Sequence, residues 1–274
     1  MLSKLILILF IVFCVFSGKK ISIRHYTIET SFIKKDSIIK IVLLSDLHST
    51  IFGKNQNQLV KKIKEQNPDL ILLSGDILDD EAPHIGTELL LSNIDNIAPI
   101  YYVTGNHEYW SHNIEQIREL ILSYKVIILS DNYVRINIKG NEFILAGIED
   151  PDKKYYEVSD YNQYISMEKA FRELDKEGSY KILLAHRPEN IENYRNFSFD
   201  LILSGHTHGG QVRLPFILNG LFAPNQGFFP KYGGGLYKHG KLIHIISRGL
   251  SVNPILPRIF NPPEMVVVTL NSDK

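Results

Sequence analysis

The feature that most constrains the fold is a short apolar run that occurs five times, each time followed by a small residue and a side chain able to bind metal. The runs begin at Ile41, Leu70, Ile100, Ile182 and Leu201, and the polar residues after them are Asp46 with His48, Asp76, Asn106 with His107, His186, and His206 with His208. Such runs, bounded by Ser, Gly or Ala, are typical of strands buried on both faces. Because ligands of open α/β sheets bind beyond the carboxyl ends of the strands, we expect the polar segments to meet at one rim.

Helical spacing of apolar residues fills the gaps between these runs. It predicts helices near 54–66, 85–97, 113–124 and 161–176, further strands at 126–129 and 265–270, and a hairpin formed by 134–138 and 143–148. We find no internal repeat and no low-complexity linker. Strands and helices that alternate along a chain of 274 residues predict one α/β domain, an αβ-sandwich, over residues 37–272.

The N-terminus carries an apolar run over residues 5–16, with Lys4 before it and Lys19 and Lys20 after it. This run is shorter than the roughly 20 residues of a spanning helix, and it is typical of a signal peptide or a short signal-anchor. We predict that residues 1–20 form a hydrophobic anchor and that the protein is membrane-associated through this segment. A cleaved signal, and therefore a secreted protein, is the alternative. Positive charge on both flanks leaves the orientation open.

Charge and cysteine content narrow the class of partner. The chain has 30 basic and 30 acidic residues, a formal net charge of zero and no long block of one sign, whereas a protein that wraps a polyanion normally has an excess of basic residues, so we expect no nucleic acid polymer as partner. The only cysteine, Cys14, lies in the apolar run, and the predicted domain therefore has no disulfide that would indicate its compartment.

The residue types favour a transition-metal site over a magnesium or calcium site. Asp46 and His48 offer a carboxylate and an imidazole, which suit Mn, Fe or Zn. Asp76 can bridge two metals through its two oxygens, although an Asp after a strand is also a common helix N-cap. Each segment alone is compatible with a structural role. Five of them at strand ends favour a dinuclear site.

This ordered set resembles the calcineurin-like metallophosphoesterase superfamily over about residues 38–208. The matching strings are Asp46-x-His48, Gly75-Asp76, Gly105-Asn106-His107-Glu108, Ala185-His186 and Gly205-His206-x-His208. The segments 205–211, 248–250 and 257–264 resemble the membrane-linked bacterial phosphodiesterase branch of that superfamily. The resemblance implies a four-layer αβ-sandwich (α/β/β/α) with mixed sheets.

The resemblance also implies two divalent metal ions, with Mn, Fe or Zn as the candidates, and a role for each matching residue. One metal is assigned to Asp46, His48, Asp76 and His208, and the other to Asp76, Asn106, His186 and His206. His107 is then a non-ligand that contacts the substrate. Asp79 occupies the place of an Asp that can orient this histidine, although it can equally be an exposed loop carboxylate.

The implied reaction is hydrolysis of a phosphoester. Two metals can activate water and neutralise phosphate charge, and His107 can protonate the leaving oxygen. Protein Ser/Thr phosphatases share the Gly-Asn-His-Glu string but carry an Arg soon after Gly-Asp, where this chain is acidic from Asp79 to Glu81. We therefore expect a phosphodiesterase or pyrophosphatase acting on a small, lipid-linked or nucleotide-sugar substrate.

Other functions and roles stay open at this point. A phosphomonoesterase or protein Ser/Thr phosphatase is the competing enzyme, and a metal-stabilised scaffold without catalysis is the competing class. Arg187, Arg213 and Arg248 can clamp phosphate or form ordinary salt bridges. The aromatic segment 214–237 can hold an acyl chain or a nucleobase, enter a membrane interface, or pack on the sheet as a long hairpin.

Overall fold

The computed structural model describes residues 20–176, 178–252 and 258–273. The predicted N-terminal anchor covers residues 1–20, and residues 1–19 of it lie outside this description. Within the described residues, no helix has the length and apolar character needed to cross a membrane.

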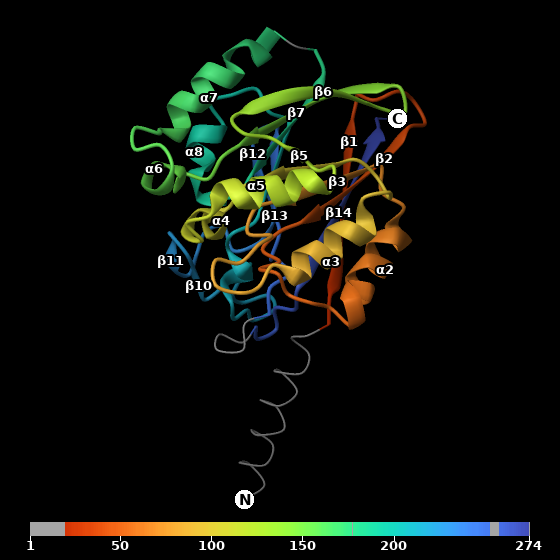
Figure 1. Ribbon diagram of the computed structural model, residues 1–274. Helices are drawn as coiled ribbons and strands as arrows, with labels where there is room; N and C mark the ends of the chain where they lie inside the picture. The colour runs from red at the N-terminus through yellow and green to blue at the C-terminus, as the bar shows by residue number, and fades with distance from the viewer. Residues whose placement is uncertain (1–19, 177, 253–257, 274) are drawn as a thin grey trace, which may run out of the picture.

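Two six-stranded sheets form the centre of the molecule (Figure 1). The first sheet has the order β1 (Ser22–Thr30), β14 (Glu264–Ser272), β2 (Ile38–Leu44), β3 (Leu70–Ser74), β4 (Ile100–Val103) and β5 (Ile127–Ile128). The second has the order β12 (Gly235–His239), β13 (Leu242–Ile246), β9 (Leu201–Ser204), β8 (Tyr180–Ala185), β7 (Asn141–Ile148) and β6 (Asn132–Ile138). Each sheet is mixed, because β14 runs antiparallel to β2 and β6 antiparallel to β7.

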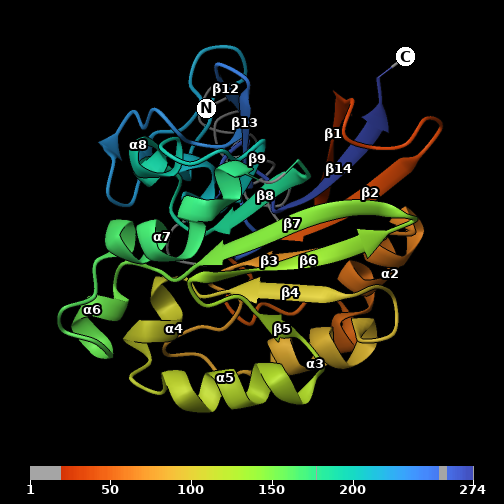
Figure 2. The same cartoon turned by 90° about the horizontal axis from the view of Figure 1, so that it is seen from above.

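Helices cover the outer face of each sheet (Figure 2). The first sheet is covered by α2 (Asn57–Gln66), α3 (Ile85–Ile94) and α5 (Ile114–Ser123), and the second by α7 (Gln163–Phe171) and α8 (Ile191–Tyr194). Three apolar clusters lie between these four layers. Along β2 the clusters alternate, since Leu43 packs between the sheets while Leu44 packs against the helices. The four-layer α/β sandwich is therefore confirmed.

The remaining elements are short. They are α4 (Asn106–Trp110), α6 (Lys153–Tyr156), β10 (Phe222–Ala223), β11 (Gly227–Phe228) and the 3-10 turns Lys54–Gln56, Arg172–Lys176, Pro188–Asn190 and His208–Gly210. The helix expected at 54–66 thus begins as a 3-10 turn, and the one expected at 161–176 ends as one.

Two features of the fold differ from the sequence prediction. Strand β1 precedes the predicted domain start at residue 37 and pairs in parallel with β14 along its whole length. The sequence did not indicate this strand, because polar residues separate its apolar residues Ile23, Tyr26 and Ile28, as an edge strand with one apolar face allows. The five polar strand ends also belong to two sheets rather than one, with β2, β3 and β4 in the first and β8 and β9 in the second.

Candidate dinuclear metal centre

The polar segments turn sharply out of their strands. Asp46, His48, Asp76, His206 and His208 all have left-handed backbones, with φ of 49°, 46°, 51°, 71° and 48°. Non-glycine residues rarely adopt this region, and such strain is concentrated at functional sites. The turns direct side chains from two sheets into one space.

Backbone and side-chain hydrogen bonds join the two sheets at this point. Nδ1–H of His186, at the end of β8, donates to the carbonyl of Ser74 at the end of β3 over 2.7 Å. The amide of His206 donates to Asp46 Oδ1 over 2.8 Å. The strand ends of the two sheets therefore meet at one rim, as the sequence predicts.

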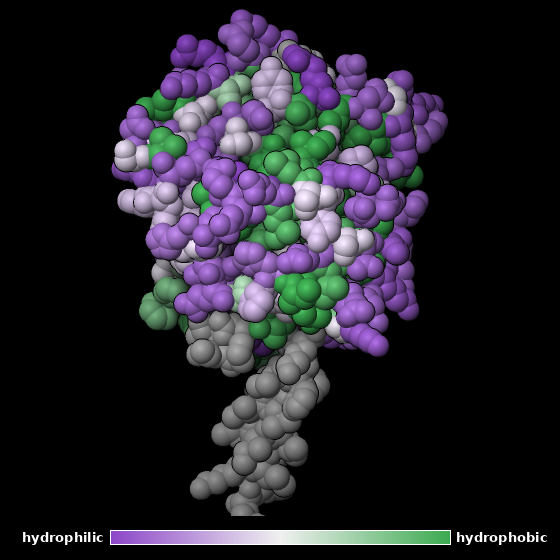
Figure 3. All heavy atoms as spheres, in the orientation of Figure 1, coloured by the Kyte–Doolittle hydropathy of each residue, from purple (hydrophilic) through white to green (hydrophobic). Residues whose placement is uncertain are grey.

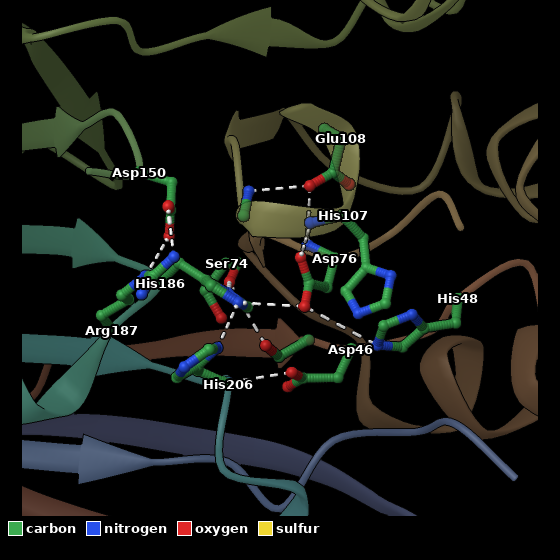
Figure 4. Close-up of polar contacts among 12 residues, drawn as sticks. Asp46, His48, Ser74, Asp76, His107, Glu108, Asp150, His186, Arg187 and His206 are labelled. Atoms are coloured by element: carbon green, nitrogen blue, oxygen red, sulfur yellow. Dashed lines mark hydrogen bonds and ion pairs between the residues drawn. The ribbon is translucent and has the colours of Figure 1, made fainter. Parts of the chain in front are cut away.

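The predicted ligands fall into two groups that share Asp76 (Figure 4). Asp46, His48, Asp76 and His208 each offer an atom within 4.8 Å of the others, and so do Asp76, His186 and His206. Asp76 Oδ2 lies 3.1 Å from His186 Nε2 and 3.7 Å from His48 Nε2. One carboxylate thus stands between the two groups, where a bridging ligand is needed.

Three predicted ligand atoms have no other use in the fold. Asp46 Oδ2, His48 Nε2 and Asn106 Oδ1 are buried and have no hydrogen-bond partner among the described residues. Buried polar atoms are rarely left in this state, and each such atom needs an explanation. A divalent cation is an explanation that fits all three, because a carboxylate oxygen, an imidazole nitrogen and an amide oxygen are all metal donors.

The electrostatics of the centre also fit cations. Burial opposes charge on Asp76, but the neighbouring His186 and His107 lower the pKa of its carboxyl well below the usual range. Burial would also lower the pKa of His186, yet Asp76 and Asp46 raise it to about 10. Positive charge is therefore stabilised here. Burial together with His186 lowers the pKa of His206, and burial together with His48 lowers that of His208, so both rings are neutral as ligation requires.

Each imidazole is oriented through its second nitrogen. Nδ1 of His48 contacts Asp79 Oδ2 at 3.1 Å, and Nδ1 of His208 contacts Ser251 Oγ at 2.9 Å. Nε2 of His206 contacts Asn225 Oδ1 at 2.9 Å. Partners of this kind fix the tautomer and direct the free nitrogen at a metal. Sequence reasoning missed Asn225 and Ser251, since both lie in loops without periodic pattern.

The aspartate that contacts His107 is Asp80, and the prediction of Asp79 for this place is wrong. Asp80 Oδ1 lies 2.5 Å from His107 Nδ1, whereas Asp79 contacts His48 instead. Asp79 also accepts the amides of Glu81 and Ala82. Burial opposes its ionisation, but the bonds from His48 and these amides lower its pKa. The backbone bonds of Asp79 turn it toward His48, which leaves the next carboxylate for His107.

Glu108 holds the loop that carries Asp76. Its two carboxylate oxygens accept the backbone amides of Asp76, Ile77, Leu78 and Gly105 over 2.7–3.1 Å. The neighbouring Gly105 must lack a side chain, because a Cβ there would lie 2.2 Å from Asp76 Oδ1. Glu108 belongs to the Gly105-Asn106-His107-Glu108 string, which by itself predicts no role for it. The structure shows that it positions the shared carboxylate.

The three candidate phosphate-clamping arginines have other partners. Arg187 makes two 2.8 Å bonds to the buried carboxylate of Asp150. Arg248 pairs with the buried Glu264, and Arg213 donates to the carbonyls of Gly209, Asn219 and Gly233. Arg187 and Arg248 thus form ion pairs, although these are buried and not the surface salt bridges that were the expected alternative.

A cavity of about 410 Å³ opens over the first ligand group. Its wall includes both predicted ligands His48 and His208 and the non-ligand His107, and it is completed by Thr50, Asp79, Ala82, Gln211, Pro224, Ser251 and Val252. The His107 ring lies 4.3 Å from that of His48 and 4.7 Å from that of Trp110. A substrate in this cavity would meet His107 and the metal positions together.

The sequence profile of the calcineurin-like phosphoesterases matches residues 39–210, more than half of the chain. The chain belongs to this family. An uncharacterized metallophosphoesterase of Helicobacter pylori is 32% identical over 242 residues, which cover 86% of this chain and 61% of the relative. One of Aquifex aeolicus is 29% identical over 253 residues, covering 90% of this chain and 91% of the relative.

This chain therefore spans about three fifths of the length of the Helicobacter relative, 61%. Among solved structures, the NAD nucleotidase of Haemophilus influenzae has a TM-score of 0.53 at 18% identity, over 80% of this chain and 46% of that one. At this identity the likeness supports the fold alone. Family membership therefore places the chain among the calcineurin-like phosphoesterases.

Proposed function

We propose that the protein is a dinuclear metal-dependent phosphodiesterase or pyrophosphatase that acts on a small substrate rather than on a nucleic acid polymer. The observation that carries this proposal is the cavity over the predicted ligands. Among the described residues, its wall contains two ligand histidines, His107 and Asp79 but neither Lys nor Arg. A phosphodiester carries one negative charge per phosphate, whereas a monoester carries a second that needs an added cation, typically an Arg clamp.

The protein residues divide the remaining tasks. Two divalent ions held by the predicted ligands would supply an activated water and neutralise charge on the phosphate. Glu108 keeps Asp76 between the two ligand groups through the loop backbone. Asp80 contacts Nδ1 of His107 and so fixes the ring. Nε2 of His107 is then the nitrogen that can give a proton to the leaving oxygen.

A lipid-linked or nucleotide-sugar substrate is the more specific part of the proposal. Pro224 in the cavity wall belongs to the aromatic segment 214–237. An apolar or aromatic substituent on the phosphate can therefore contact this segment while the phosphate lies over the metal positions. Mn, Fe or Zn remain the metals we expect, because the ligand set mixes carboxylate with imidazole.

The decisive experiment measures turnover of bis-p-nitrophenyl phosphate and p-nitrophenyl phosphate by the full chain with Mn²⁺. We expect kcat/KM for the diester to exceed that for the monoester by about tenfold or more, as loss of one charge-assisted contact is worth roughly 1.5–3 kcal/mol. Asp76→Ala and His206→Ala should abolish both activities while circular dichroism shows a folded domain.

Three results would contradict the proposal. A faster monoester reaction would favour the competing phosphomonoesterase. Bound metal with no turnover of any phosphoester would instead favour a metal-stabilised scaffold. Retained turnover in either alanine variant would show that the metal centre lies elsewhere.

A further inference from the structure

Two consecutive turns of the segment 214–237 hold large apolar side chains out into solvent. Phe216 is fully exposed, Ile217 is 84% exposed, and Phe228 and Phe229 are 70% and 69% exposed. Only one other large hydrophobic side chain of the described residues, Tyr155, is exposed to this degree. Of the aromatic residues Phe216, Phe222, Phe228, Phe229 and Tyr232 in this segment, Tyr232 alone is buried.

The backbone that holds these rings outward is strained at two of them. Phe216 and Phe229 have left-handed φ values of 67° and 56°, which bulky residues avoid. The first turn is closed by Leu214 and Leu218, which exchange backbone hydrogen bonds. The second is closed by the pairing of β10 with β11 and by the Phe229 amide, which donates to Leu221. Strain maintained by surrounding bonds suggests that exposure of the rings has a use.

An arginine-lined cavity of about 470 Å³ adjoins the first turn. Arg24, Arg213 and Arg248 line it together with Phe216 and Ile217. Glu264 is the carboxylate that pairs with Arg248 and lies 4.0 Å from Arg24, and Arg213 donates only to amide oxygens in this part of the described chain. The cavity is therefore lined by three positively charged side chains, with one carboxylate beside them. This excess of positive charge suits an anionic phosphate group.

The described chain begins beside this cavity. Ser22, the first residue of β1, donates its amide to Pro263 and contacts Arg248 Nη2 through its hydroxyl. In the sequence, the apolar run 5–16 lies a few residues before Lys20. Figure 1 places the start of β1 and the β10–β11 pair at the same lower end of the molecule, and Figure 3 shows green, apolar side chains interrupting the hydrophilic surface at that end.

The metal centre lies at this end too. Strand β1 is parallel to β14, which is antiparallel to β2. The start of β1 and the end of β2 therefore lie at the same end of the sheet. The turn between β10 and β11 carries Pro224 in the wall of the substrate cavity and Asn225 against the His206 ring. A surface that binds the exposed rings would therefore lie beside the substrate cavity.

We define the arginine–aromatic face as Arg24, Arg213, Phe216, Ile217, Phe228 and Phe229. We propose that this face docks on an anionic lipid bilayer, with its apolar side chains in the interface and phospholipid phosphates at its arginines. Rings that enter the interface beside basic residues are a known mode of surface binding. Docking in this way adds a second contact to any made by residues 5–16, and it opens the substrate cavity along the membrane surface. It does not depend on which ester the protein hydrolyses.

The first test measures ring insertion in the full chain. Phe216→Trp and Phe228→Trp are each made together with Trp110→Phe, which removes the only native tryptophan, and Leu122→Trp in the same background is the control because Leu122 is exposed on α5. Vesicles contain phosphatidylglycerol and brominated phosphatidylcholine. We expect roughly half of the emission at 216 and 228 to be quenched and that at 122 to be unchanged, since interfacial side chains reach about 5–10 Å into the bilayer.

Equal emission with brominated and plain vesicles at both 216 and 228 would overturn the proposal. Quenching at 122 as strong as at 216 and 228 would also overturn it, because the chain would then meet the bilayer without this face. The two turns are probed separately, so that a folding defect in one variant leaves the other as a test.

The second test measures charge recognition by vesicle sedimentation. Arg24→Gln should lower binding to phosphatidylglycerol vesicles about fivefold, the effect of one basic residue near an anionic surface, and leave binding to phosphatidylcholine vesicles unchanged. Arg172→Gln is the matched control, because Arg172 is an exposed arginine paired with Glu168 next to α7. Equal losses for Arg24→Gln and Arg172→Gln would contradict a specific role for the face.

Discussion

The two sheets contribute to the candidate centre in different ways. The first sheet supplies all the candidate oxygen ligands, Asp46, Asp76 and Asn106, with one imidazole, and Glu108 holds the Asp76 loop by accepting its backbone amides. The second supplies three imidazoles, each fixed by a side chain or carbonyl at its second nitrogen. Damage to the first set should therefore disturb the loop itself, whereas damage to the second should weaken metal binding and leave the fold intact.

The largest expected effect follows from Glu108→Gln. The amide nitrogen of Gln would face two backbone N–H donors, each left unsatisfied at about 1–3 kcal/mol, and Asp76 would shift. We expect a lower melting temperature and about a hundredfold loss of kcat/KM, as for other residues that orient metal ligands.

Glu119→Gln is the matched control, because Glu119 is exposed on α5. Calorimetry and diester turnover measure both effects. Unchanged stability in Glu108→Gln would contradict the role of backbone amides in the first sheet.

A smaller effect is expected from Asn225→Ala in the second set. His206 would lose the partner that fixes its tautomer, so we expect metal affinity to fall by about 10–30-fold with little change in melting temperature of the metal-free protein. Metal titration by calorimetry gives the affinity.

Asn196→Ala serves as control, since this exposed side chain donates only to the Glu192 carbonyl. If Asn225→Ala lowered the stability of the fold more than the control does, the expected difference between the candidate ligands of the first sheet and those of the second would be contradicted.

The smallest effect separates the neighbouring aspartates. Asp80→Asn should lower kcat about fivefold to tenfold through His107, more strongly for a diester with an alkyl leaving group than for a nitrophenyl ester. Asp79→Asn should weaken metal affinity through His48 instead. Turnover at saturating metal and metal titration distinguish these outcomes. The reverse pattern would restore Asp79 as the partner of His107.

The sequence predicted most of the central strands because burial on both faces leaves an unmistakable apolar run, as in β3 and β8. It did not predict β1, where only Ile28 and Thr30 are buried. Nor could strand patterns tell that β8 and β9 lie in a second sheet, since burial of Leu184 and Leu203 looks the same in either sheet.

The candidate ligands were accessible to prediction because they follow strands directly, while their partners were not. Asp79 and Asp80 differ by one position in a loop, and only the backbone bonds of that loop decide which carboxylate meets which histidine. Asn225 and Ser251 contact His206 and His208 across long sequence separations, and no local pattern records such contacts.

Helix α4 carries five consecutive side chains with five different attachments. Asn106 is a candidate ligand, His107 contacts Asp80, Glu108 holds the Asp76 loop, Tyr109 donates to Glu149, and Trp110 donates to Asp152. Each residue of a helix is turned by about 100° from the one before it, so one inserted or deleted residue would misdirect every later attachment at once. The length of this turn of helix is therefore constrained as strictly as its side chains, and an inserted residue should be tolerated better in the loops around it.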